Sequence, residues 1–179
     1  MERLTTTWID DDQLELVLAL LMPQNRLIMQ LAIHTGLRIG DILALRSDQL
    51  KPRVTVREQK TGKSHRISIP AKLLRAIQAQ AGEVWAFPGR DPDRPKTRQA
   101  VWADVKRAAA AMRISANVGP HTMRKIYAVR KLAASGGNLA AVQQALNHSD
   151  MAVTMIYAMA DHLTQQRRGE PGRRRGHPR

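Results

Sequence analysis

One short segment, GPHTMRKIY, places a histidine and an arginine, His121 and Arg124, three residues apart after a proline that suits a helix start. Side chains at this spacing lie on one face of a helix. In the first turn they would lie at the positive end of the helix dipole, where anions bind. The pair therefore suggests phosphate binding, and a capped helix with a solvated face would use the same residues.

Two further cations occur at junctions rather than inside elements. Arg38 follows Gly36 in HTGLRIGD, at the expected start of a helix, where free amides and a guanidinium together suit a phosphate. Lys60 lies in EQKTGK, the expected tip of a β-hairpin, where an ammonium could protonate a leaving oxygen if the tip leans over a substrate. Taken alone, Arg38 also fits a surface residue paired with Asp41, and Lys60 fits a solvated turn residue, as Lys63 does.

A histidine and a tyrosine stand close together near the C-terminus. The segment ALNHSDMAVTMIYAM places Tyr157 nine residues after His148, in a chain that has only 2 tyrosines. Asn147 stands at an expected helix end, and Asn tolerates the left-handed conformation that such ends often need. A tyrosine on an apolar helix is more often a core residue with its hydroxyl at the edge, and Tyr127 fits that description.

The elements that would position these residues are mainly helices. Hydrophobic periodicity, with Pro and Gly at the ends, predicts helices at about 10–22, 23–36, 39–45, 71–81, 97–112, 121–135, 138–146 and 150–160. The stretch RVTVREQKTGKSHRISIP alternates in hydrophobicity about Gly62 and predicts a β-hairpin with a polar tip. We therefore expect a mainly α fold with a small antiparallel β-sheet, of the α+β class.

Charge is the main compositional signal. The chain of 179 residues has 29 Lys and Arg against 15 Asp and Glu, a net charge of +14. The segment 166–179 carries six Arg and one Glu, so residues 1–165 are basic as well. Such a surplus predicts a polyanionic partner, with nucleic acid first and ribosomes or an anionic membrane surface as alternatives.

Composition also excludes several classes of protein. Hydrophobic residues make up 43% of the chain, which is typical of a globular domain and not of a disordered one. The chain has 0 Cys, which excludes disulfides, thiolate zinc sites and cysteine nucleophiles. The first 22 residues do not read as a signal peptide, and the apolar stretches are too short to span a membrane. We expect a soluble, cytoplasmic protein.

Together these segments resemble the catalytic domain of the tyrosine recombinases, the phage-integrase family, over nearly all of residues 8–160. Four blocks match in order: TGLRIGDILAL, EQKTGKSHRISIP, HTMR and LNHSDMAVTMIY. The family motif has an arginine after a TG turn, a hairpin lysine, His-x-x-Arg, a further His or Trp, and a Tyr nine residues later. These positions correspond to Arg38, Lys60, His121, Arg124, His148 and Tyr157.

The match has two departures at individual positions and one further likeness. Asn147 stands where the family commonly has Gly, and Lys125 stands where it often has His or Ser. Neither change removes a catalytic group. The segment VWAFP, residues 84–88, looks like the family strand that leads into the loop before the long helix.

The resemblance implies site-specific recombination by metal-independent DNA cleavage and rejoining. Tyr157 would attack the scissile phosphodiester and form a 3′-phosphotyrosyl link, and Lys60 would act as the general acid for the departing 5′-oxygen. Arg38, Arg124 and His148 would stabilise the phosphate, whose transition state gathers negative charge. His121 would assist proton transfer or position the phosphate. Neither a nucleotide cofactor nor a metal is implied.

The resemblance also implies a domain organisation and partners. Residues 1–165 would form the catalytic domain and 166–179 a basic, flexible tail. The N-terminal core-binding domain that most family members carry has no counterpart here, so we expect a fragment of a longer protein or a short single-domain member. The expected partner is double-stranded DNA, bound by a homo-oligomer, a tetramer, of a prokaryotic or phage-encoded, nucleoid-associated protein.

Three alternatives remain at this point. A type IB topoisomerase-like enzyme would use related chemistry to relax DNA, whereas the block spacings favour integrases. A non-catalytic basic DNA-binding module would not require the whole set of six polar residues. An RNA-binding protein finds little support, because aromatic residues make up only 3% of the chain and offer no stacking platform. The DNA target, and the choice among integration, excision, inversion and resolution, stay open.

Overall fold

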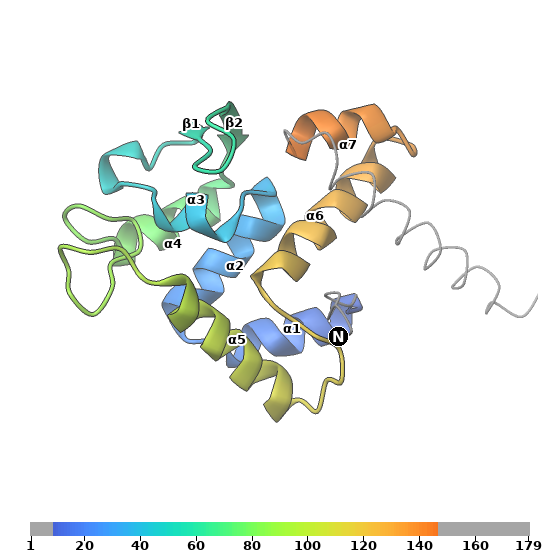
Figure 1. Cartoon of the computed structure of the whole chain (residues 1–179), viewed down its shortest axis with the longest axis horizontal. Coiled ribbons are helices and arrows are strands. Elements are labelled where there is room, and N and C mark those ends of the chain that lie inside the picture. The colour runs from blue at the N-terminus through green and yellow to red at the C-terminus, as the bar shows by residue number, and fades with distance from the viewer. Residues whose placement is uncertain (1–8, 147–179) are drawn as a thin grey trace, which may run out of the picture.

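The computed structural model describes residues 9–146, and its centre is a single helix (Figure 1). This helix, α2 (Pro23–Thr35), begins at a proline in its first position and ends at Gly36, whose φ of 68° is left-handed. It contacts four other helices: α1 (Asp11–Leu20), α3 (Ile39–Leu43), α4 (Ala71–Gln80) and α6 (Pro120–Ala134). The junction that holds Arg38 is therefore anchored on the central element.

The sheet of the described chain is one antiparallel hairpin. Strand β1 (Arg53–Arg57) pairs with β2 (Ser64–Ser68), with Val54 opposite Ile67. Alternate residues of both strands are buried, as a half-buried sheet requires. Gly62 takes a left-handed φ of 68° in the turn, a conformation that costs glycine little. The hairpin predicted from the sequence is confirmed.

The remaining helices form the C-terminal half of the described chain. Helix α5 (Arg98–Ala111) is capped by Thr97, whose hydroxyl accepts a hydrogen bond from the Ala100 amide at 3.1 Å. Helices α6 and α7 (Leu139–Leu146) follow, and the short 3₁₀ helix η1 (Ser47–Gln49) precedes the hairpin. The expected mainly α fold with a small antiparallel sheet is confirmed. The helix expected at 150–160 lies outside the described residues.

The strand expected at 84–88 is wrong. Only isolated bridges occur there, between Arg46 and Trp85 and between Pro88 and Pro95. The partner segment turns into η1 at Ser47, which ends the pairing after one bridge. Pro88 also has no N–H to donate to a ladder. The segment is therefore a loop that crosses η1 rather than a strand.

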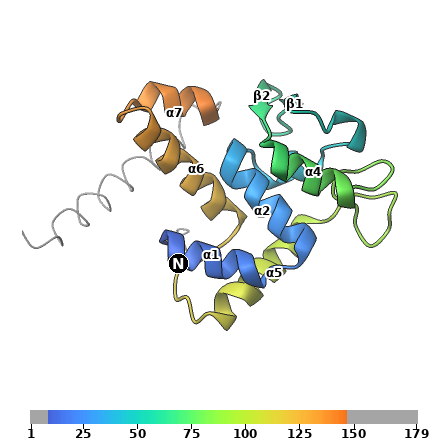
Figure 2. The same cartoon turned by 180° about the vertical axis from the view of Figure 1, so that it is seen from behind.

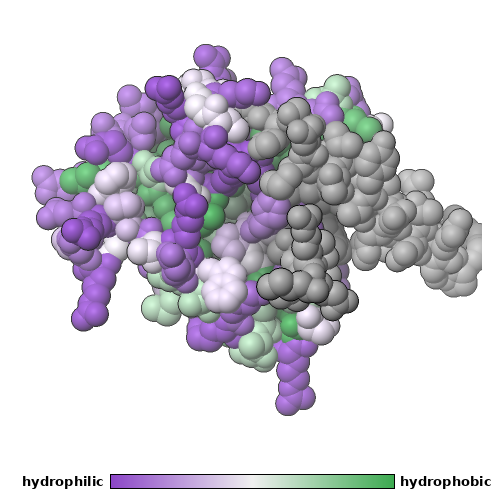
Figure 3. Space-filling model, viewed as in Figure 1, coloured by the Kyte–Doolittle hydropathy of each residue, from purple (hydrophilic) through white to green (hydrophobic). Residues whose placement is uncertain are grey.

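Two ends of the molecule can be distinguished. Helices α1 and α5 lie at one end, and the hairpin and α7 lie at the other, on opposite sides of α2 (Figures 1 and 2). The larger cluster of buried hydrophobic residues runs from α1 to α6 and includes the inward face of the hairpin, and a smaller one joins α6 to α7. Hydrophilic side chains gather over the hairpin end in Figure 3. Between residues 9 and 146, no helix is long and apolar enough to cross a membrane.

Candidate phosphate-binding site

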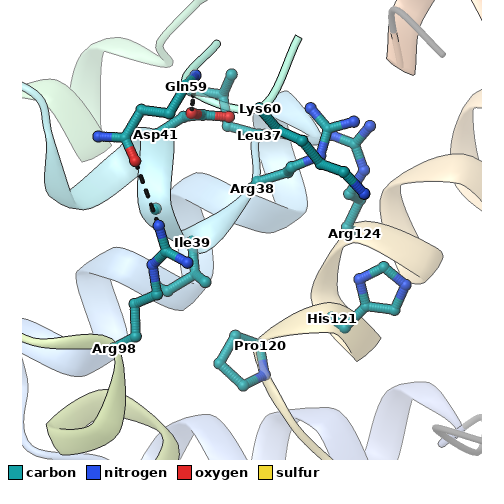
Figure 4. A pocket seen from close by; sticks show the side chains of 11 residues that line it. Leu37, Arg38, Ile39, Asp41, Gln59, Lys60, Arg98, Pro120, His121 and Arg124 are labelled. Atoms are coloured by element: carbon teal, nitrogen blue, oxygen red, sulfur yellow. Dashed lines mark hydrogen bonds between the residues drawn. The ribbon is translucent and has the colours of Figure 1, made fainter.

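A pocket of about 410 Å³ lies where four segments of the fold meet. Its lining comes from the start of α3, the hairpin tip, and the first turns of α5 and α6 (Figure 4). Four residues predicted from the sequence line it together: Arg38, Lys60, His121 and Arg124. Residues more than eighty positions apart in the sequence thus surround one space. His148 and Tyr157, the other two predicted residues, lie outside the described part of the chain.

Arg124 is the most deeply held cation of the pocket. It lies in the first turn of α6 and is only 3% exposed. Its guanidinium donates to the Gly36 carbonyl and, at 2.8 Å, to the Leu146 carbonyl. Burial, together with the neighbouring charge of Arg38, lowers the pKa of Arg124 to about 10, so the group is still a cation at neutral pH. Arg124 therefore joins the C-terminal ends of α2 and α7 while it faces the pocket.

Arg38 is held by a carboxylate. Its Nη1 donates to Oε2 of Glu58 at 2.7 Å, and the Glu58 side chain has 0% exposure. The second terminal nitrogen, Nη2, is buried and has no hydrogen-bond partner among residues 9–146. A buried donor without a partner is costly, so this nitrogen is suited to an anion that enters the pocket. The pairing with Asp41 that the sequence offered as an alternative does not occur.

Asp41 instead anchors the hairpin tip. One of its carboxylate oxygens accepts a hydrogen bond from the Gln59 amide at 2.9 Å. The Gln59 side chain in turn accepts a bond from Arg98 on α5 at 3.3 Å, and both bonds are visible in Figure 4. Lys60, the next residue, is exposed and extends from the tip toward the two arginines (Figure 4). The tip is thus attached to α3 and α5, with Lys60 at the edge of the pocket.

His121 lies one turn before Arg124 on α6, with its ring at the pocket (Figure 4). Burial lowers its pKa, and the charges of Lys125, Arg124 and Arg38 lower it further. At neutral pH the ring is therefore neutral and can accept a proton.

Tyr127 has a packing role in this structure. Its ring lies so close to Gly36 that a Cβ at that glycine would overlap it, and any other residue there would be strained by the left-handed φ as well. Burial raises the pKa of its phenol, although Arg124 opposes that rise. A half-buried phenol with a raised pKa is a poor nucleophile. Both observations agree with the prediction of a core tyrosine.

Sequence reasoning missed Glu58. The carboxylate is fully buried beside the pocket, and it also accepts a hydrogen bond from the Thr61 hydroxyl at 2.7 Å. A signal was available, because Glu58 directly follows the strand and continues the alternation of its two buried residues, Val54 and Val56, on the inward side. An acidic residue in an inward position next to a cationic site needs a cationic partner.

The electrostatics of the pocket favour an anion. Four cations line it (Arg38, Lys60, Arg98 and Arg124), and the acidic groups beside it are Asp41 and Glu58, both already engaged by the hairpin or by Arg38. Within residues 9–146, no group of three or more His, Cys, Asp and Glu is arranged to hold a metal ion. A phosphodiester, with one negative charge shared by two non-bridging oxygens, is an anion that such cationic donors bind.

The chain is similar in sequence to known proteins. The chain is 32% identical over 162 residues to the tyrosine recombinase XerD of Lacticaseibacillus casei, a match that covers 80% of this chain and 52% of that protein. The chain therefore spans about half the length of this relative.

Two solved structures have the same fold. The crystal structure of the XerA recombinase matches with a TM-score of 0.69 at 18% identity, over 90% of this chain and 65% of that one. The lambda integrase catalytic core matches with a TM-score of 0.68 at 19% identity, over 80% of this chain and 92% of that one. The model of the phage integrase family matches residues 7–163. The chain belongs to the phage integrase family.

Proposed function

We propose that this chain is a site-specific tyrosine recombinase that cleaves and rejoins DNA strands through a covalent link to Tyr157. Membership of the phage integrase family supports this function, as does the similarity to a protein named as a tyrosine recombinase. The chain supplies the matching residues in the expected order, from Arg38 to Tyr157.

One observation carries the proposal. Two arginines from separate helix starts, Arg38 and Arg124, line one pocket together with Lys60 and His121, and one terminal nitrogen of Arg38 has no partner within residues 9–146. Structural arginines normally have all their donors engaged when buried. On a surface that only binds DNA, we would expect the cationic side chains to be exposed to solvent. Arg124 is only 3% exposed. This arrangement supports stabilisation of a single phosphate.

The proposed reaction is a substitution at phosphorus. The Tyr157 oxygen forms a bond to the phosphorus while the bond from phosphorus to the 5′-oxygen breaks. Lys60 gives a proton to the departing 5′-oxygen, and the phenol proton passes to a base, for which His121 in the pocket lining is the candidate. Arg38, Arg124 and His148 stabilise the charge on the non-bridging oxygens. Reversal by a different 5′-hydroxyl rejoins the strand, so no external energy source is consumed.

We extend the proposal to partners and organisation. Double-stranded DNA is the partner that a net charge of +14 and a phosphate pocket suit best. A structure of the similar XerH recombinase was solved bound to its difH substrate. A homotetramer on DNA, a catalytic domain over residues 1–165, a basic tail over 166–179 and a cytoplasmic location belong to the same proposal.

The experiment is a selection for covalent products. The full chain is mixed with a pool of nicked duplexes whose arms are randomised, and complexes that survive denaturant are isolated and sequenced. A nick beside the cleavage point lets the short strand diffuse away, which traps the intermediate. We expect a recurrent sequence in complexes from the wild-type chain and none from Tyr157→Phe, which should still bind DNA. Equal yields from both chains would contradict the proposal.

The same DNA separates recombination from its rivals. A topoisomerase-like enzyme would relax any supercoiled plasmid, whereas a recombinase would exchange strands only between plasmids that carry the selected sequence. A DNA-binding module would retain DNA and form no covalent complex. Strand exchange that depends on the selected sequence is the result we expect.

A further inference from the structure

We infer that Glu58 is a positioning residue that aligns the phosphate-binding fork of Arg38 with the hairpin tip that carries Lys60. The inference rests on the proposed function, since it assigns to Glu58 a part in the same reaction. Glu58 does not line the pocket and does not reach a substrate there. It acts through the two residues that it holds.

The geometry makes Glu58 a shared anchor. Its Oε2 accepts hydrogen bonds from Arg38 Nη1 and from the Thr61 hydroxyl, both at 2.7 Å. Arg38 begins α3, whereas Thr61 follows Lys60 at the hairpin tip. A single oxygen atom therefore connects the residue that clamps phosphate to the neighbour of the proposed general acid. The backbone amide and carbonyl of Glu58 also bond Lys63 and Gly62, at 2.9 and 2.8 Å, so the anchor is fixed within the turn.

Arg38 is the cation that forms an ion pair with Glu58. Its other oxygen, Oε1, has no hydrogen-bond partner among residues 9–146, and His65 Nδ1 lies 3.6 Å away, beyond hydrogen-bond distance. Burial lowers the pKa of His65, so the ring is neutral at pH 7 and does not compete for the carboxylate. Burial alone would raise the pKa of Glu58, but the bonds from Thr61 and Arg38 and the charges of Arg38 and Arg124 together lower it. The carboxylate is thus ionised when Arg38 binds it.

The arrangement has a consequence for the fork. With Nη1 bonded to Glu58, the orientation of the Arg38 guanidinium at the pocket is set, and its other terminal nitrogen, Nη2, stays without a partner among residues 9–146. A long arginine side chain otherwise loses considerable rotational entropy when it binds a ligand. Glu58 provides that order before DNA arrives, which is the form of preorganisation that accelerates a reaction.

The test measures covalent adduct formation by Glu58→Gln on the selected nicked duplex. Glutamine keeps the shape of the side chain and removes its charge. We expect cooperative thermal unfolding, DNA affinity within about 3-fold of wild type, and a rate lower on the order of 10-fold to 100-fold. The matched control is Glu83→Gln, which removes an exposed carboxylate far from the pocket lining and should react like wild type.

A modified substrate shows whether the loss passes through Arg38. A methylphosphonate at the scissile position replaces one non-bridging oxygen with a methyl group and removes the negative charge of the phosphate, so it removes part of what Arg38 would bind. The Glu58→Gln defect should shrink at least about 5-fold on this substrate. A merely structural defect would be the same on both substrates and would overturn the inference.

A second variant tests the role of Glu58 even if Glu58→Gln does not fold. Thr61→Val changes a half-buried hydroxyl and leaves the Arg38 pair intact, and we expect a rate loss of roughly 3-fold. If Thr61→Val and any folded Glu58→Gln protein both react within 2-fold of wild type, the inference is wrong. If the wild-type chain forms no adduct, the proposed function itself fails, which is a different result.

Discussion

The two arginines of the pocket are held in different ways. On the hairpin side, Arg38 pairs with a buried carboxylate, Glu58, and keeps one nitrogen without a partner among residues 9–146. On the α6 side, Arg124 donates to two backbone carbonyls, of Gly36 and Leu146. Neutral carbonyls do not cancel a charge, and burial lowers the pKa of Arg124 to about 10. The charge of Arg38 is thus balanced by Glu58 before an anion binds. The charge of Arg124 is not balanced by the carbonyls that it binds, and its hydrogen bonds join two helix ends.

The comparison shows that two arginines in one pocket can contribute to the stability of the fold in different ways. Loss of Arg124 removes donors from two carbonyls that end α2 and α7, whereas loss of Arg38 strands a buried carboxylate. The first defect is mainly a loss of hydrogen bonds, which is present at every pH, whereas the second depends mainly on the charge of Glu58 and so on pH. Substitutions on the two sides can therefore separate chemistry from architecture.

The largest effect on rate is expected from Lys60→Ala, on the hairpin side. Loss of the general acid should slow adduct formation roughly 10²–10⁴-fold, with little change in thermal stability because Lys60 is exposed. A 5′-thio leaving group needs no proton and should recover most of the rate. Lys63→Ala, in the same turn, is the control, and an equal loss there would contradict the role of Lys60.

Arg124→Ala should lower both rate and stability. We expect a rate loss of about 10²–10³-fold. The two carbonyls lose a donor at every pH, so the melting temperature should fall by roughly 3–10 °C at pH 7 and should also be lowered at pH 5. Arg130→Ala is the control on the same helix, because its bond to Asp11 is exposed and the change should stay within about 2 °C. An unchanged melting temperature for Arg124→Ala would show that its bonds to the two carbonyls are unimportant.

Arg38→Ala should give a pH-dependent loss of stability. In the wild type the lowered pKa of Glu58 means that its stabilisation is present above pH ~4.3 and is lost as pH falls through the lowered value. Without Arg38, burial favours the protonated carboxyl and the pKa rises. The deficit relative to wild type, about 3 kcal/mol at pH 7, should therefore shrink toward pH 5. Denaturant unfolding at both pH values measures it, and a constant deficit would contradict the pairing.

His121→Gln should have the smallest effect, a rate loss of roughly 10-fold. Because burial lowers the pKa of His121, the wild-type rate should fall only below pH 6.5, where the ring gains a proton. The variant should lose this part of the pH–rate profile. His34→Gln changes an exposed histidine outside the pocket lining and should retain it. An unaltered profile in His121→Gln would assign the titration to another group.

Much of the fold followed from local patterns. Helix ends at Gly36 and starts at Pro23 and Pro120 were readable because these residues have few other backbone choices. The segment 84–88 was misread because a likeness to the family strand does not reveal whether a partner strand continues, and here the partner becomes η1. The ends of a helix depend on nearby residues, whereas the pairing of a strand depends on a partner segment elsewhere in the chain.

Part of the site was predictable because several of its residues stand in short local motifs. Arg38, Lys60, His121 and Arg124 stood in recognisable blocks, and the structure brings them around one pocket. Glu58 was missed because its partner lies 20 residues away, across α3, and only its inward position in the hairpin marked it. The roles of all six predicted residues stay predictions until reaction rates are measured.

The most direct measurement identifies the residue that becomes attached to DNA. The full chain is reacted with the selected nicked duplex, digested with protease and nuclease, and analysed by mass spectrometry for a peptide that carries a nucleotide remnant. We predict the remnant on Tyr157. A remnant on Tyr127 or on another residue, or cleaved DNA without any linked peptide, would contradict the proposed function.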